Sequence, residues 1–131
     1  MGDMCGGLSV ISDIPKTTVY ELCKWINRTN EIIPNETIEK PPSAELKPNQ
    51  KDTDTLPDYN TLDSIIHNHI EHYESSEEII NKDKNKETVN WVTQTIKKNE
   101  HKRKQAPIGL KVTSKAFGSG RRIPIAARYN L

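Results

Sequence analysis

Apolar residues recur at helical spacing in several stretches of the chain, separated by polar or proline-rich segments. The first stretch predicts a helix with Asp13 and Pro15 as start signals and an end between Asn27 and Asn30. Its apolar stripe, at i, i+3, i+4 and i+7, is Val19, Leu22, Cys23 and Ile26. One face of this segment is therefore expected to be buried.

Three further helices follow. A second helix is expected after a cap at Asn60 or Thr61, with the stripe Leu62, Ile65, Ile66, His69, Ile70 and Tyr73. A short third helix is expected at 75–80, where acids fill the first turn. A fourth, from about Glu87 to Asn99, has the stripe Val89, Val92 and Ile96.

The remaining segments lack a period. The chain opens with glycines and a short apolar stretch at 8–11, and residues 31–60 contain five prolines and predict one long loop. The tail after Gln105 is expected to be irregular or extended. The predicted fold class is mostly α with long loops.

Composition limits the size of the core. The 131 residues are 33% hydrophobic and 28% charged, so at most one domain with a thin core is expected, and a larger partner would help it to pack. Cys5 and Cys23 are read as reduced thiols, and no run reaches the ~18 apolar residues of a membrane span. A cytoplasmic location is expected.

Charge is unevenly distributed. Residues 97–128 contain ten Lys or Arg and one acid, Glu100, although the net charge of the whole chain is only +1. Such a segment suits phosphate or nucleic acid, or is a solvated basic face. The cluster KKNEHKRK, at 97–104, also fits cations at the end of a helix.

Two further groups carry possible chemistry. Four histidines, His67, His69, His72 and His101, lack the spacing of a metal set, so they are interpreted as polar side chains exposed to water and no metal ligand is assigned. In KPPSAELKPNQKDTD, a hydroxyl at Ser43 and acids at Glu45, Asp52 and Asp54 suit a mobile loop that closes over a polyphosphate with Mg²⁺. The alternative for this segment is an exposed acidic linker. No phosphate-binding loop motif is present.

Three stretches, in order, resemble the C-terminal end of the NAD synthetase family, in particular its glutamine-dependent form. They are GDMCGGLSVISDIPKTTVYELCKWIN, KPPSAELKPNQKDTDTLPDYNTLDSII and HKRKQAPIGLKVTSKAFGSGRRIPIAARY. The resemblance implies a C-terminal fragment of a doubly wound α/β synthetase domain, spanning 1–131, without the phosphate-loop half and the glutaminase domain. It also implies amidation of deamido-NAD to NAD through an adenylated intermediate, with ATP and Mg²⁺ as cofactors.

The resemblance assigns roles to individual residues. Lys16 and Ser43 match positions that bind ATP, and Lys102 matches the lysine that binds deamido-NAD. His101 is the neighbour of Lys102, and Asp3 falls in the loop that faces the same substrate. Glu45, Asp52 and Asp54 fall in the mobile active-site loop. No catalytic residue is assigned.

The implied partners are deamido-NAD, ATP, glutamine or ammonia, the remaining half of the enzyme and a second copy in a homo-oligomer. Neither a membrane nor a nucleic acid is expected. The isolated chain is predicted not to make NAD. Two alternatives stay open: a non-catalytic basic protein that binds RNA or another polyanion, and a remnant that does not fold.

Overall fold

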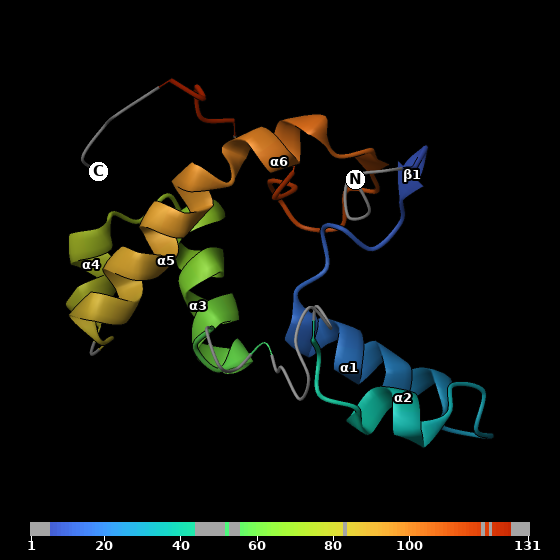
Figure 1. Cartoon of the computed structure of the whole chain (residues 1–131). Helices are drawn as coiled ribbons and strands as arrows, with labels where there is room; N and C mark the ends of the chain where they lie inside the picture. Colours follow the sequence, from blue (N-terminus) through green and yellow to red (C-terminus); the bar gives the residue numbers. More distant parts are fainter. Residues whose placement is uncertain are drawn as a thin grey trace. The chain divides into compact units, whose positions relative to one another are not determined.

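The computed structural model describes residues 6–43, 52, 56–82, 84–118, 120 and 122–126. These residues form a mostly helical structure with two short parallel strands, in agreement with the predicted class. The chain divides into two compact units, Pro15–Asp63 and the pair of segments Met1–Ile14 and Ser64–Leu131. Figure 1 follows the order of the elements along the chain.

In the unit Pro15–Asp63, helix α1 (Lys16–Ile26) confirms the first predicted helix. Asn27 follows the helix, and its side chain holds the next turn of the chain, since Oδ1 accepts hydrogen bonds from the backbone N–H groups of Ile32 and Ile33. A short helix, α2 (Asn35–Glu39), lies inside the segment that was predicted to be one loop. No residue that the structure describes in this unit is buried.

Helix α3 (Tyr59–Ile70) starts in this unit and continues into the other one. The predicted cap at Asn60 or Thr61 is wrong, because Asp58 Oδ1 accepts the hydrogen bond from the Thr61 N–H at 3.0 Å. The helix also ends before Tyr73, the last residue of the predicted stripe. Tyr73 has a left-handed φ of 59°, which no helix residue adopts.

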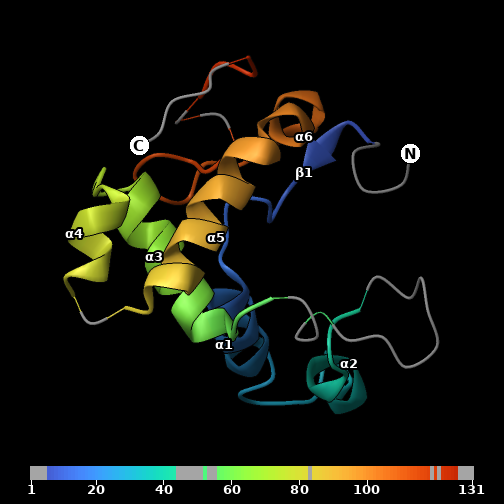
Figure 2. The same cartoon turned by 60° about the vertical axis from the view of Figure 1, so that its left-hand side comes forward.

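Helices α4 (Ser76–Ile80) and α5 (Lys86–Lys98) confirm the third and fourth predictions. Ser75 caps α4 in a capping box with Glu78, and Asn85 caps α5 by accepting from the Thr88 N–H at 3.0 Å. α4 packs beside α5, as both Figure 1 and Figure 2 show. The two helices therefore have well-defined starts and bury a common face.

The described core lies in the unit that contains these two helices. Its buried apolar residues are Ile65, Ile70, Ile79, Val89, Val92, Ile96 and Ala116. His69 is also buried, at 2% exposure, with Nδ1 2.9 Å from the carbonyl oxygen of Glu74. The prediction that His69 is an exposed polar side chain is therefore wrong, since it belongs to the interior.

The basic segment continues directly from α5. Helix α6 (Glu100–Gln105) follows a single linking residue, so the cluster at 97–104 spans two helices rather than one helix end. Strand β2 (Ile108–Gly109) then pairs in parallel with β1 (Leu8–Ser9). A Cβ at Gly109 would lie 2.1 Å from Ser12 Oγ, so a larger residue here would displace the Ser12 hydroxyl from its hydrogen bond to the Ser9 carbonyl oxygen.

Candidate functional site

The start of α1 carries the first predicted ATP contact. Lys16 is the first residue of the helix, and its exposed side chain places Nζ 5.8 Å from the centroid of the Tyr20 ring. The neighbouring Thr17 donates from its N–H and from Oγ1 to Asp63 Oδ2, at 2.9 and 2.8 Å. Asp63 therefore satisfies a first-turn donor of α1, while the Lys16 ammonium remains accessible to an anion.

The loop predicted to be mobile is tied at its base. The Asp52 N–H donates to the carbonyl oxygen of Pro42 at 2.9 Å, which brings the Ser43 and Asp52 ends of the segment together. Tyr59 donates from its hydroxyl to Asp52 Oδ2 at 3.2 Å. Burial, followed by the negative charge of Asp52, raises the pKa of Tyr59 to about 12, so Tyr59 stays a donor at neutral pH. Glu45 and Asp54, and also Asp3, lie outside the described residues.

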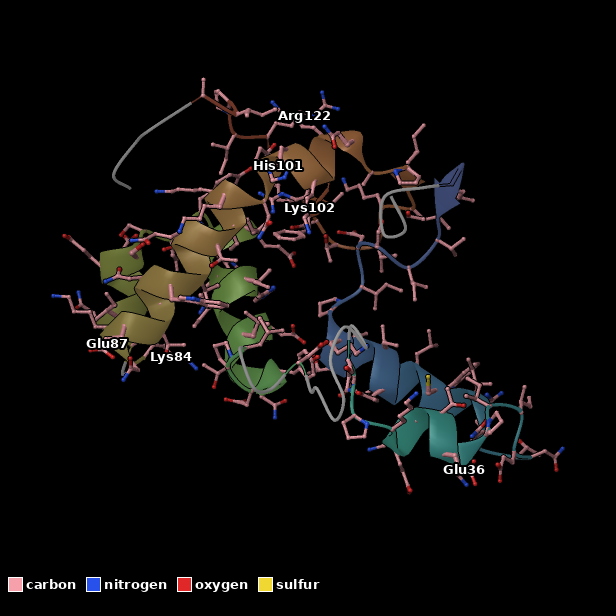
Figure 3. The ribbon with its side chains drawn as sticks, in the orientation of Figure 1. Glu36, Lys84, Glu87, His101, Lys102 and Arg122 are labelled. Carbon is pink, nitrogen blue, oxygen red and sulfur yellow. The ribbon has the colours of Figure 1, made fainter. Side chains whose placement is uncertain are left out.

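Helix α6 presents the predicted deamido-NAD contacts. His101 and Lys102 are both exposed, and Figure 3 labels them on this helix. His101 Nδ1 lies 2.9 Å from the carbonyl oxygen of Lys98, so Nδ1 carries the proton and donates it. The opposite side of α6 is anchored, because Arg103 binds Glu100 Oε2 through Nη2 at 2.8 Å and also binds the carbonyl oxygen of Ile96.

A cavity of about 620 Å³ opens beside α6 and the strand pair. Its apolar wall includes Ile108 and Phe117, and its cations are Arg103, Lys104 and Arg122. Arg103 also stacks on Phe117, with Cζ 4.9 Å from the ring centroid. Because Glu100 neutralises Arg103, the positive charge available to a ligand comes from Lys104 and Arg122, for which the described part of the chain shows no ion pair.

Asp13 fixes the loop that lines this cavity. Its carboxylate accepts hydrogen bonds from the N–H groups of Val112, Thr113 and Phe117, each at 2.7 Å, and from Thr113 Oγ1 at 3.0 Å. Burial raises the pKa of Asp13, but the hydrogen bonds from Thr113, Val112 and Phe117 outweigh burial, and the pKa lies below its ordinary value. Asp13 is therefore a charged anchor for the basic tail. It does not cap α1, whose N-cap is Pro15.

The structure thus distributes the predicted site over both units. Lys16, Ser43 and Asp52 belong to Pro15–Asp63, and His101 and Lys102 belong to the other unit. Sequence reasoning missed Asp13 as an anchor and did not distinguish Lys104 and Arg122 from the other cations. No local pattern marks these roles, since Asp13 and Thr113 lie 100 positions apart.

The chain is mostly helical with one parallel strand pair, and its cavity is basic and partly apolar. These features are typical of a protein that binds an anionic ligand. The family model described as NAD synthase matches residues 1–106. The chain belongs to the NAD synthase family.

Two glutamine-dependent NAD(+) synthetases are similar to this chain over nearly its whole length. It is 54% identical over 129 residues to the glutamine-dependent NAD(+) synthetase of Synechocystis sp., and 48% identical over 130 residues to that of Thermotoga maritima. Each match covers 98% of this chain and 23% of the relative. The chain therefore spans about a quarter of the length of these relatives.

A solved structure is also similar. The structure of glutamine-dependent NAD+ synthetase from Acinetobacter baumannii in complex with ADP matches with a TM-score of 0.52 and 36% identity. The match covers 86% of this chain and 19% of that one. Among the helices of the described residues, none has the length and hydropathy that crossing a membrane requires.

Proposed function

We propose that this chain forms the C-terminal portion of a synthetase domain that amidates deamido-NAD to NAD. In this reaction, the nicotinate carboxylate attacks the α-phosphorus of ATP, pyrophosphate leaves, and ammonia then displaces AMP from the mixed anhydride. Glutamine is the proposed source of the ammonia in the complete enzyme. The observation that carries the proposal is the 54% identity to the Synechocystis synthetase across 98% of the chain.

The proposed roles of the chain's own residues rest on charge and exposure. Lys16, accessible at the start of α1, would neutralise charge that develops on the departing pyrophosphate. Ser43 would donate its hydroxyl to ATP, and Asp52 would help to position the loop next to it. His101 and Lys102, exposed on α6, would bind deamido-NAD together with Asp3.

ATP and Mg²⁺ are proposed for the complete enzyme. The binding of ADP by the Acinetobacter relative supports an adenine nucleotide, and the accessible Lys16 ammonium fits its phosphates. The described residues contain no group of three or more His, Cys, Asp or Glu side chains that could hold a metal ion. Mg²⁺ is therefore proposed only with ligands that include other parts of the enzyme, as is assembly into a homo-oligomer.

The strand pair supports the need for a complementary part. β1 and β2 have two residues each, and a parallel sheet of this size is not stable by itself. The paired residues Leu8 and Ile108 are exposed at 55% and 79%, as side chains on an uncovered face of a larger sheet would be. We propose that the rest of the synthetase domain covers these side chains and extends the sheet.

A chimera tests the proposal. The corresponding 23% of the Synechocystis synthetase is replaced by this chain, and NAD is measured after addition of ATP, Mg²⁺, deamido-NAD and ammonia. We expect turnover by the chimera and none by the isolated chain. A folded chimera without turnover would contradict the proposal, and turnover by the isolated chain would contradict the need for a complementary part.

Variants of the chimera test the assigned roles. Lys16→Ala is expected to lower kcat roughly 100-fold, because a cation that stabilises developing charge is lost. Lys102→Ala is expected to raise KM for deamido-NAD roughly 10-fold with a smaller effect on kcat, as loss of one charged hydrogen bond predicts. The controls are Lys24→Ala and Lys98→Ala, exposed lysines near the ends of α1 and α5. Wild-type kinetics in both test variants would show that the roles are wrongly assigned.

A second candidate function, binding of RNA or another polyanion, is favoured by the cations Lys104 and Arg122 at the cavity. It predicts RNA binding by the isolated chain with a steep dependence on salt. A Lys104→Ala/Arg122→Ala double variant should then lose most of that affinity. RNA binding that is weak and unchanged in the double variant would eliminate this candidate.

A further inference from the structure

Two of the four histidines meet at the end of α3. His67 lies in the last turn of the helix and His72 lies two residues beyond it, and their Nε2 atoms are 3.1 Å apart. The rings are almost perpendicular, at 87°, with centroids 4.7 Å apart. The other two histidines are not available to this pair, since His69 is buried and His101 lies on α6.

The hydrogen bonds around His67 define which of its nitrogens has a lone pair. Nδ1 of His67 is 2.9 Å from Glu71 Oε1, and a carboxylate can only accept, so the proton is on Nδ1. In the neutral form of His67, Nε2 therefore presents a lone pair toward His72, and His72 Nε2 donates the shared proton. The pair holds one proton between two nitrogens that can both become metal ligands.

Glu71 is itself held in place from the basic tail. Its second oxygen, Oε2, accepts from Ser114 Oγ at 2.8 Å and from the Ser114 N–H at 3.3 Å. Its carboxylate thus accepts from Ser114 on one oxygen and from His67 on the other, which fixes its orientation. A carboxylate that orients an imidazole through Nδ1 is the usual second partner of a metal-binding histidine.

We propose that His67 and His72 form a binding site for a divalent transition-metal ion such as Zn²⁺, Ni²⁺ or Cu²⁺, with Glu71 as the positioning residue. Nitrogens 3.1 Å apart, each at a usual bond length of about 2.0–2.1 Å from one ion, subtend an angle of about 100° at the metal. That angle lies between octahedral and tetrahedral values. Water completes the coordination.

Binding needs no net loss of protons from the pair. The ion replaces the shared proton but lies to one side of the line between the two nitrogens, because each metal–nitrogen bond is longer than half of their 3.1 Å separation. The proton on His72 shifts from Nε2 to Nδ1, and both rings turn their Nε2 lone pairs toward the metal. Imidazole nitrogen favours Zn²⁺, Ni²⁺ and Cu²⁺ over Mg²⁺, which prefers oxygen ligands. The site is thus distinct in chemistry from the Mg²⁺ of the proposed reaction.

The bound ion would tie three segments together. It would link the last turn of α3 to the residues that follow it and, through Glu71, to Ser114 in the basic tail. Because the same tail segment is anchored by Asp13 at Thr113, metal binding is expected to stabilise the loop that lines the cavity. This inference goes beyond the proposed function and does not depend on it.

The test is a titration of the full 131-residue chain with Zn²⁺ or Ni²⁺ alone, followed by calorimetry and by NMR of the imidazole nitrogens. We expect one ion per chain, and Zn²⁺ shifts of Nε2 in His67 and His72 but not in His69. Millimolar Mg²⁺ should not compete. Binding that shifts other groups and leaves these two nitrogens unchanged would overturn the proposal.

Variants give a second measure of the same site. His67→Ala or His72→Ala should weaken binding more than 10-fold, and Glu71→Ala about 10-fold, the lower limit for loss of an orienting partner. His101→Ala is the matched control and should leave metal affinity unchanged. Both paired histidines are exposed, so alanine removes no core contact, and circular dichroism verifies the fold. Equal affinity in wild type and in His67→Ala would refute the site.

Discussion

The hydrogen bonds of Asp13 make it the most informative position for a test of the fold. Asp13→Ala removes the acceptor for the N–H groups of Val112, Thr113 and Phe117, each at 2.7 Å, and for the Thr113 hydroxyl. Asp13 is buried, at 6% exposure, so water can replace the carboxylate only in part. The substitution should therefore break the contact between segment 112–117 and position 13.

The magnitude follows from the number of donors left without a partner. Each part-buried N–H that loses its acceptor costs about 1–1.5 kcal/mol, and three such groups give roughly 3–5 kcal/mol. A small domain has only about 5–15 kcal/mol of stability, so this loss is a large fraction of the total. Asp13→Asn keeps one accepting oxygen but turns an NH₂ group toward the remaining donors, and at least half of the loss is expected.

Amide hydrogen exchange measured by NMR gives the local readout. We expect exchange at Val112, Thr113 and Phe117 to accelerate roughly 100-fold in Asp13→Ala, which corresponds to about 3 kcal/mol. Glu39→Ala, at an exposed position on α2, is the control for loss of one negative charge. If the three amides exchange less than threefold faster in Asp13→Ala than in wild type, the carboxylate does not anchor this segment.

Three shorter predictions follow from the same structure. The pKa of Asp13 is lowered on folding, so its contribution to stability is complete above the unfolded pKa of about 3.9 and is lost as pH falls through the folded pKa. The urea concentration at the unfolding midpoint of the wild type should therefore be lower at pH 3 than at pH 5, and the difference should be smaller for Asp13→Ala. Asn85→Ala removes the cap of α5 and should cost about 1 kcal/mol by urea unfolding, against no change for the exposed Asn60→Ala. Ile79→Ala opens a fully buried site between α4 and α5 and should cost about 2–5 kcal/mol in the same assay, which a shift below ~1 kcal/mol would contradict.

The periodic segments could be predicted because the apolar stripe and its burial are local properties. α4 and α5 begin and end within one residue of the expected positions, and α1 begins directly after Pro15 and ends at Ile26, just before the expected range Asn27 to Asn30. α2 could not be found this way, since five residues with no buried side chain show no stripe. The start of α3 was missed because Asp58, Asn60 and Thr61 are all good caps, and only the hydrogen bond from the Thr61 N–H identifies Asp58.

The candidate site depended on contacts that no local pattern records. His69 lies on the predicted stripe with Ile65 and Ile70, and burial on that stripe was a better guide than its polarity. The anchoring of Thr113 by Asp13 joins residues 100 positions apart, and the pairing of β1 with β2 is equally distant. By contrast, the roles proposed for Lys16 and Lys102 came from family resemblance, and their action on one ligand stays a prediction.

The basic cluster at 97–104 shows why charge counted along a sequence overestimates the charge offered to a partner. Glu100 and Arg103, one helical turn apart on α6, form an ion pair whose side chains are only 3% and 12% exposed. Arg103 also binds the carbonyl oxygen of Ile96, so this pair fixes α6 against α5. With that side of the short helix buried, Lys102 is left on the exposed side. Arg103 therefore stabilises the fold, and the positive charge that the cluster offers to a ligand is smaller than its count of five Lys and Arg residues indicates.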